Sequence, residues 1–306
     1  MKIFTTFDSM EKLNEACALS IGVFDGIHLG HQRIIKQLHK KAGKGCKGIV
    51  TFDKRPASYF NPLGEALPIM TLEHRLSLLE KYGLDFALVL CFDHTIADLS
   101  FESFLQKIMD KAPIKNLILG ENASFGKERG GNETTLPSFA HKHAFNLTFL
   151  KKSLMQNNVI SSTLARNLVT DGNLKKLKKI LGRRYTLFTP NFSPKELTKK
   201  GKWHTFQLCF ENLTALPSGT YTISIENGYV SLPGFALLTT ESSLSPKRYV
   251  VDVFFGSGTL QQGPLTLLFI NQTPPKAQNH PLKQFEHSLS SSLLLQTSMK
   301  NITTKE

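Results

Sequence analysis

Two histidines three residues apart, His28 and His31, have the type and spacing to handle phosphate. They come directly after an apolar run, residues 19–24, and the turn-forming pair Asp25–Gly26. Apolar residues at helical spacing follow, so both imidazoles should lie on one face of a beginning helix. A helix N-terminus favours phosphate, and imidazole donates hydrogen bonds to phosphate oxygens and titrates near neutral pH. The stretch therefore predicts a phosphate site. The alternative is a sharp strand-to-helix turn with incidental histidines. Three glycines would let the backbone approach a ligand closely: Gly22, Gly26 and Gly30.

A second pattern suited to phosphate lies further along the chain. Ser161, Ser162 and Thr163 precede Arg166 at the expected beginning of another helix. Hydroxyls and backbone N–H groups donate to phosphate locally there, and the guanidinium adds a charge-assisted fork. Taken alone, the pattern also fits an ordinary helix cap followed by a surface arginine.

A charged, glycine-rich loop between Gly120 and Gly131 is the third stretch with chemical potential. It follows an expected strand and contains Asn122, Phe125, Gly126 and Arg129. A loop in that place can contact a ligand, and the alternative is an ordinary surface hairpin.

The elements that must position these residues alternate between strands and helices. Continuous apolar runs predict strands at residues 19–24, 48–52, 85–92, 116–120 and 146–150, with helices between them. Thr71, Ser100 and Asp171 are expected to cap helices, the last of which ends at Gly182. Strands that are apolar throughout indicate a parallel sheet covered on both faces, with ligands beyond its carboxyl ends. We therefore predict an α/β domain over residues 1–182.

The pattern of apolar and polar residues changes after Gly182. Short alternating runs at residues 206–210, 219–225, 249–255 and 265–270 are separated by Pro, Gly, Ser and Asn. Four to six such strands predict a small closed or nearly closed antiparallel β-barrel over residues 183–306. An amphipathic C-terminal helix is expected at residues 281–296, and the two halves are expected to work separately.

The spelling G-x-F-D-G-x-H-x-G-H, residues 22–31, resembles the adenylyltransferase half of the prokaryotic bifunctional riboflavin kinase/FMN adenylyltransferase (FAD synthetase) family. That half is a Rossmann-like HxGH nucleotidyltransferase domain. The resemblance implies ATP binding by Gly22, Phe24, Asp25, Gly26, Gly30, Ser161, Ser162 and Thr163, and catalytic roles for His28, His31 and Arg166. Residues 120–131 resemble the family's flavin loop, which implies flavin binding by Asn122, Phe125, Gly126 and Arg129. Three positions depart from the family pattern: Asn122, Ala123 and Leu164.

The second half lies where the family carries riboflavin kinase, but its motifs differ. By resemblance, Thr205 would hold magnesium and phosphate, whereas Gln207 stands where the family has asparagine. Asp252 is the nearby acid that could replace the family's glutamate. A working kinase and a degenerate scaffold both remain open.

Composition narrows the remaining function classes. Hydrophobic residues make up 41% of the chain, and the four cysteines are scattered without a CxxC pair, which argues against zinc and against a disulfide framework. The beginning of the chain lacks a signal-peptide pattern, so a cytoplasmic location without a membrane partner is expected. The net charge of +13 contains lysine clusters without interleaved aromatics, which favours a solvated helix face over nucleic-acid binding.

The resemblance implies transfer of AMP from ATP to FMN, giving FAD and pyrophosphate. The implied partners are small molecules: ATP with Mg²⁺, FMN and, if the kinase works, riboflavin. The magnesium would be bridged by phosphates, with Thr205 the one doubtful protein ligand. Two alternatives stay open: another HxGH transferase, such as a cytidylyl- or nicotinamide mononucleotide (NMN) adenylyltransferase, and a flavin- or nucleotide-binding protein without turnover. The residues do not indicate an oligomeric state.

Overall fold

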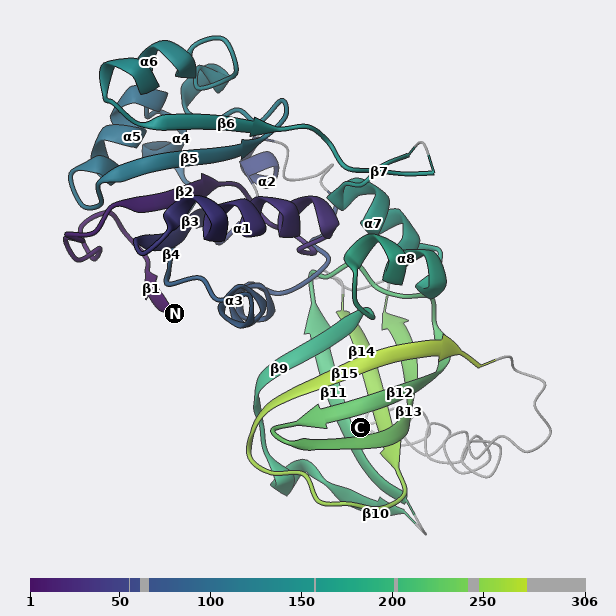
Figure 1. Ribbon diagram of the computed structural model, residues 1–306. Helices are drawn as coiled ribbons and strands as arrows, with labels where there is room; N and C mark the ends of the chain where they lie inside the picture. Colours follow the sequence, from purple (N-terminus) through teal and green to yellow (C-terminus); the bar gives the residue numbers. More distant parts are fainter. Residues whose placement is uncertain (55, 61–65, 157, 201–202, 242–247, 274–306) are drawn as a thin grey trace, which may run out of the picture.

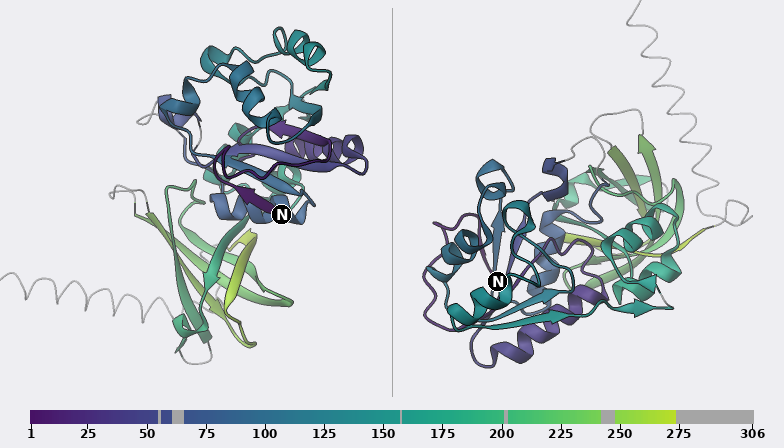
Figure 2. Two further views of the ribbon diagram at one scale, coloured as in Figure 1. Left: turned by 90° about the vertical axis from the view of Figure 1, so that its left-hand side faces the viewer. Right: turned by 90° about the horizontal axis from the view of Figure 1, so that it is seen from above.

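The computed structural model describes residues 1–273 except 55, 61–65, 157, 201–202 and 242–247. The helix expected at residues 281–296 lies outside the described residues. The chain forms an α/β half and a curled antiparallel half that adjoin each other (Figure 1). Two further views show them as neighbouring bodies, with the helices of residues 162–181 at the junction (Figure 2).

The α/β half is built on a six-stranded sheet in which every pair of neighbouring strands is parallel. The strand order is β1-β4-β3-β2-β5-β6. These strands are β1 (Lys2–Phe4), β2 (Cys17–Ile21), β3 (Cys46–Phe52), β4 (Phe86–Leu90), β5 (Ile114–Gly120) and β6 (Asn146–Leu150). The parallel sheet predicted from the apolar runs is confirmed. The short strand β1 was not predicted.

Helices cover both faces of this sheet. The longer ones are α1 (Leu29–Ala42), α3 (Leu72–Lys81), α5 (Phe101–Met109) and α6 (Leu136–Lys142), with short helices α2 (Pro56–Phe60) and α4 (His94–Ala97). One apolar cluster lies between the sheet and α1 with α3, and another lies between the opposite face and α5 with α6. The predicted caps Thr71 and Ser100 are confirmed, because each side chain accepts the N–H three residues on.

A hairpin, β7 (Leu154–Met155) with β8 (Asn158–Val159), leads to helices α7 (Ser162–Thr170) and α8 (Leu174–Leu181). The cap predicted for the lysine-rich helix α8 is wrong: Asn173 caps it, whereas Asp171 ends α7. Gly172, with φ +67°, makes the turn between them and so separates the two cap-competent residues. The four lysines of α8 are exposed, as a solvated helix face requires: Lys175, Lys176, Lys178 and Lys179.

The second half is a seven-stranded antiparallel sheet that curls into an open barrel, with edge strands β10 and β9. Its strands are β9 (Thr186–Phe192), β10 (Thr198–Lys200), β11 (Trp203–Glu211), β12 (Gly219–Asn227), β13 (Val230–Glu241), β14 (Arg248–Phe255) and β15 (Gly263–Gln272). The sequence predicted only four to six strands. The inward-facing apolar residues of this sheet share one continuous cluster with α7 and α8.

The cysteine pattern did not reveal one pairing. The structure joins Cys17 and Cys46 in a disulfide, whereas Cys91 and Cys209 are free and exposed. Cys17 and Cys46 are register partners on the neighbouring strands β2 and β3, with Cα atoms 4.7 Å apart. Parallel pairing creates this proximity between residues 29 apart in sequence, so spacing alone could not predict it.

Candidate active site

A cavity of about 230 Å³ lies at the carboxyl ends of β2, β5 and β6. The chain runs from β2 outward to β3 and β4 on one side, and returns to place β5 and β6 on the other. Such a reversal of strand order opens a crevice between neighbouring loops, which is the usual ligand site of an open α/β sheet. The lining includes Gly22, Phe24, His28, Gly30, His31, Arg33, Glu121, Ala123, Lys151, Lys152 and Ser153.

The two histidines form a stacked pair in this cavity. Their ring centroids are 3.8 Å apart with an interplanar angle of 17°, and Phe24 packs against His31 at 5.0 Å. His28 is the N-cap of α1: its Nδ1 accepts the N–H of His31 at 3.4 Å. In the neutral ring this leaves the proton on Nε2, so His28 presents one N–H donor to a ligand.

Both imidazoles are kept uncharged in the ligand-free fold. Burial, assisted by the charge of Arg183, lowers the pKa of His28 to about 4. Burial also holds the pKa of His31 well below its usual range, assisted by His28, Arg75 and Arg183. The sequence-based expectation that these histidines titrate near neutral pH is therefore wrong for the ligand-free protein. A neutral imidazole still donates one hydrogen bond to phosphate.

The turn that delivers His28 is held in an unusual conformation. Phe24, Gly26 and Ile27 have φ values of +56°, +82° and +38°, in the left-handed region. Such a conformation is a genuine outlier for a β-branched residue, and each strained position costs on the order of 1–3 kcal/mol. Only surrounding contacts can hold such a turn, and the neighbouring elements provide them.

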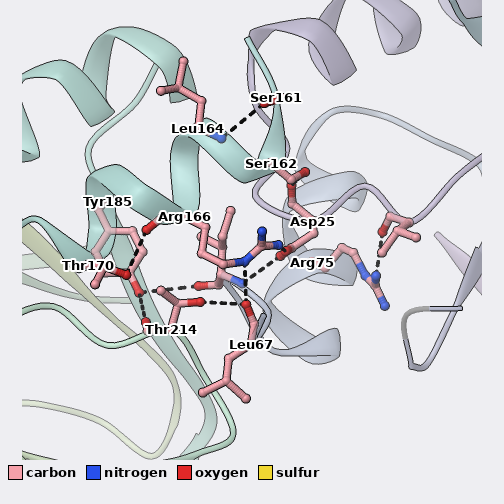
Figure 3. A network of polar contacts seen from close by, with 12 residues as sticks. Asp25, Leu67, Arg75, Ser161, Ser162, Leu164, Arg166, Thr170, Tyr185 and Thr214 are labelled. Carbon is pink, nitrogen blue, oxygen red and sulfur yellow. Dashed lines mark hydrogen bonds and ion pairs between the residues drawn. The ribbon is translucent and has the colours of Figure 1, made fainter. Parts of the chain in front are cut away.

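One set of contacts comes from α7. Arg166 is buried, and its Nη2 forms an ion pair with Asp25 Oδ2 at 3.0 Å while its Nε donates to the carbonyl of Leu67 at 2.7 Å (Figure 3). Asp25 Oδ1 accepts the N–H of Ile69 at 2.9 Å. Ser162 Oγ donates to the carbonyl of Asp25 at 2.8 Å. The second motif therefore reaches the first through the protein itself.

A second set of contacts comes from the barrel. Thr214, in the connection between β11 and β12, donates its N–H to the Pro68 carbonyl at 2.8 Å. Its Oγ1 donates to the Leu67 carbonyl at 2.7 Å (Figure 3). The buried Tyr185 hydroxyl donates toward the Ile69 carbonyl at 3.4 Å. Residues 67–69, which support Asp25 and Arg166, are thus held by the second half of the chain.

The structure brings some predicted ATP-binding residues to the cavity and leaves others away from it. Gly22, Phe24, His28, Gly30 and His31 line it. Gly30 serves packing there, because a Cβ would lie 3.0 Å from the His28 ring. The remaining predicted residues support the turn or helix α7 from outside this lining: Asp25, Gly26, Ser161, Ser162 and Arg166, with Thr163 exposed on α7.

The predicted flavin loop borders a separate, largely aromatic cavity of about 520 Å³. Its lining includes Phe52, Tyr59, Phe60, Phe92, Phe104, Ser124, Phe125, Gly126 and Arg129. Of the predicted flavin residues, Phe125, Gly126 and Arg129 take part, whereas Asn122 is not in this lining. Gly126 has φ +77°, and a Cβ there would lie 2.6 Å from the Phe101 backbone nitrogen, so only glycine lets the loop pack against α5.

The three predicted kinase residues also come together. Gln207 and Asp252 are cross-strand partners on β11 and β14, and Gln207 Nε2 donates to Asp252 Oδ1 at 2.8 Å. Thr205, two residues earlier on the same face of β11, shares a 2.7 Å hydroxyl contact with Thr198. These side chains are therefore engaged with protein groups.

Several lining residues were missed by sequence reasoning. Glu121 comes directly after β5, and Lys151, Lys152 and Ser153 come directly after β6. The rule that ligands bind at the carboxyl ends of parallel strands would have found all four. Within the described part of the chain, no three His, Cys, Asp or Glu side chains form a group that could hold a metal ion. No helix among the described residues is long and apolar enough to cross a membrane.

An all-parallel sheet with a two-histidine cavity at its strand-order reversal defines an open α/β protein with a candidate ligand site where such sheets bind ligands. A family model described as FAD synthetase matches residues 10–164. The chain belongs to this FAD synthetase family.

Its relatives include three chains named bifunctional riboflavin kinase/FMN adenylyltransferase. The protein of Listeria monocytogenes is 32% identical over 184 residues, covering 59% of this chain and 58% of its own. That of Buchnera aphidicola subsp. Schizaphis graminum is 26% identical over 229 residues, covering 74% of this chain and 73% of its own. That of Escherichia coli K12 is 25% identical over 243 residues, or 78% of each chain.

A solved structure matches nearly the whole chain. It is described as a macrolide-efflux protein from Streptococcus pneumoniae, with a TM-score of 0.71 over 96% of this chain and 97% of that one. At 18% identity, this likeness shows a shared fold alone.

Proposed function

We propose that this protein transfers AMP from ATP to FMN, forming FAD and pyrophosphate. One observation carries the proposal: consecutive residues of a single loop line both cavities. Ala123 lines the two-histidine cavity, and Ser124 and Phe125 line the aromatic one. A nucleotide in the first and a flavin ring in the second would meet at this loop, where the phosphates of the two substrates must react.

The reaction needs positioning more than it needs a protein nucleophile. The second pKa of a phosphate monoester is about 6, so FMN carries a dianionic phosphate near pH 7. That phosphate attacks the α-phosphorus of ATP, and pyrophosphate leaves with the electron pair of the broken bond. The protein therefore contributes alignment and donors for the charge that develops on the α-phosphate and the leaving group.

Named residues can fill these roles. His28 Nε2–H and His31 would donate to the α-phosphate region, with Arg33, Lys151 and Lys152 around the cavity attracting the anionic nucleotide. Phe125 and Arg129 would contact the flavin. Ser161, Ser162, Thr163 and Arg166 stay predicted ligands of the terminal phosphates.

Magnesium fits this site as an ion that arrives with ATP. Glu121 is the one carboxylate in the cavity lining, and its Oε2 already accepts the Lys152 N–H at 3.1 Å. When bound to the triphosphate, the ion would neutralise part of its charge.

Separating products by chromatography tests the proposal. Purified protein is incubated with Mg-ATP and, in parallel reactions, FMN, riboflavin or NMN, and separately with Mg-CTP. We expect FAD and pyrophosphate from FMN. NAD or a cytidylyl product in place of FAD would identify another transferase, and no product from any pair would indicate a binding protein.

The variant His31→Ala ties this activity to the cavity. Loss of one preorganised donor at a developing charge typically costs about 10²–10³ in turnover, so we expect a loss of that order in FAD formation. His141→Ala, on the exposed face of α6, is the matched control and should retain the wild-type rate. Near wild-type turnover by His31→Ala at an unchanged melting temperature contradicts the assignment of this cavity.

A further inference from the structure

Arg183 is the first residue after the α8 cap, and it reaches back to the turn that carries His28. Its Nη2 donates to the Gly26 carbonyl at 3.0 Å, and its Nη1 donates to the Ile27 carbonyl at 3.1 Å. Nη1 also lies 3.4 Å from the Leu181 carbonyl at the end of α8. Gln32 Nε2 donates to the same Ile27 and Leu181 carbonyls, at 2.9 and 2.7 Å. The turn and the end of α8 are thus tied together by one guanidinium and one amide.

These contacts fall on the residues with left-handed φ, of which Ile27 is the strained one. Gly26 and Ile27 are consecutive positions with left-handed φ, and each directs its carbonyl at Arg183. Strained backbone persists only when its surroundings over-determine it. A planar fork with two donors fits two neighbouring carbonyls, whereas a lysine ammonium is a single point charge that cannot reproduce that fork.

The charge of Arg183 is balanced without a carboxylate. Among the described residues, no carboxylate forms an ion pair with Arg183, and the buried Nε of Arg183 has no hydrogen-bond partner. The carbonyls that it contacts and the negative end of the α8 dipole stabilise the guanidinium instead. Its positive potential therefore remains available to a nearby anion. That potential also reaches the neighbouring imidazoles, since it lowers the pKa of His28, His31 and His74.

We infer that Arg183 is a positioning residue for adenylyl transfer, which holds the turn Phe24–Ile27 in the shape that presents His28 and places a positive charge behind the two imidazoles. This inference rests on the proposed function for its catalytic consequence and on the contacts above for its structural one. Other charged groups also lie near the rings: Arg75 from α3, and Arg33, Glu121, Lys151 and Lys152 in the cavity lining.

Three variants separate the paired hydrogen bonds of the Arg183 guanidinium (the fork) from its positive charge. Arg183→Met removes both, Arg183→Lys keeps the charge without the fork, and Arg184→Met is the control at the next residue. A misplaced catalytic group can cost about 10²-fold, so we expect a loss of kcat/KM of that order in Arg183→Met. Arg183→Lys should lose at least about tenfold. Arg184→Met should keep the wild-type value.

Nuclear magnetic resonance of the histidine side chains provides a readout that general loss of stability would not produce. In the ligand-free protein we expect the His28 pKa to rise from about 4 in Arg183→Met and to stay low in Arg183→Lys. Amide exchange at Ile27, whose N–H donates to the Phe24 carbonyl at 3.2 Å, should accelerate in both. If Arg183→Met does not fold, Arg183→Lys alone decides through its kcat/KM and its Ile27 exchange.

Unchanged kcat/KM together with unchanged His28 titration and Ile27 exchange overturns the inference. A wild-type protein that forms no FAD would contradict the proposed function instead. In that case the titration and the exchange rates still test whether Arg183 holds the turn.

Discussion

At the scale of single residues, the buried histidines make stability depend on pH. His74 is 4% exposed, stacks on Phe188 and shares a 3.1 Å contact with Thr186 Oγ1. Burial lowers its pKa to about 3, and that of His28 to about 4. The unfolded chain, with histidines near 6.5, therefore binds protons first as the pH falls. Full stability is present above about pH 6.5 and is lost progressively toward pH 4.

Each such histidine should lower the free energy of unfolding by about 1.4 kcal/mol per pH unit below 6.5. Urea unfolding at several pH values between 7.5 and 5 measures this slope. His74→Gln, which cannot be protonated in this range, should reduce the slope, whereas the exposed-site variant His141→Ala should not. Equal slopes in His74→Gln and wild type would mean that His74 has the same pKa in the folded and the unfolded protein.

Residue types predicted this site unevenly. The spacing of His28 and His31 was sufficient to predict that both lie at the beginning of one helix, because the strand, the turn and the helix follow one another directly in sequence. Arg183 left no such signal, since an arginine that donates to backbone carbonyls needs no partner residue of a particular type. The depressed histidine pKa values were also hidden, because burial depends on elements remote in the chain.

At the scale of elements, α7 supports the turn through a buried ion pair. Arg166 and Asp25 have side chains 8% and 5% exposed, and removal of one partner leaves an uncompensated buried charge. Breaking such a pair typically costs about 3–5 kcal/mol. We expect Arg166→Met to lose stability of that order by urea unfolding. Arg166→Lys should also be impaired, because one ammonium cannot reach both Asp25 and the Leu67 carbonyl as the guanidinium does.

A double-mutant cycle with Asp25→Asn separates the two roles of Arg166. If Arg166 acts through Asp25, the two substitutions should be strongly non-additive in kcat/KM and stability. If Arg166 instead grips the terminal phosphates, its substitution should raise the KM for ATP equally with or without Asp25. Arg166→Lys with wild-type kinetics and stability would contradict both roles.

The helices and strands that were missed have local physical reasons. β13 contains Pro233 and Gly234, which read as a break between strands. Pro233 is accommodated because pairing with β14 begins only at Gly234, so no neighbour on that side requires its missing N–H. Gly234 is required there, because a Cβ would lie 2.7 Å from the Phe254 carbonyl oxygen. The low strand propensity of proline and glycine is therefore outweighed at these two positions. Pro233 lies where the pairing with β14 has not yet begun, and Gly234 allows the backbone of β14 to approach closely.

At the scale of the whole molecule, the two halves are not packed as independent units. The apolar residues of α7 and α8 lie in the same cluster as the barrel strands, and Arg183 and Thr214 contact the turn and the segment 67–69 beside the candidate site. The residues that line the two-histidine cavity all lie within 1–182, whereas the turn that carries His28 is also supported from beyond residue 182. We expect a fragment 1–182 to lose most FMN-to-FAD activity and to expose apolar surface. A fragment with full-length kcat/KM would contradict this coupling.

The barrel's own activity gives the second whole-molecule prediction. Gln207 stands where the resemblance implies an asparagine, and its side chain is hydrogen-bonded to Asp252. We therefore expect slow phosphorylation of riboflavin. Full-length protein with saturating Mg-ATP should then form FAD rapidly from FMN and slowly from riboflavin. Gln207→Asn should raise the riboflavin rate and leave the FMN rate unchanged. Comparable initial rates from the two flavins in the wild type would indicate a competent kinase.

The shared core of α7, α8 and the barrel also sets the order in which a ribosome-bound chain can mature. The six parallel strands and the helices on both their faces are complete by Leu150, so that sheet can fold while the rest is being synthesised. The apolar faces of α7 and α8 must wait for Leu265, Leu267 and Phe269 of β15, the last strand among the described residues. Until β15 has emerged, helices α7 and α8, which carry Arg166 and lead to Arg183, lack part of the core that holds them in place. The nascent enzyme therefore acquires its catalytic geometry only after β15 has been synthesised.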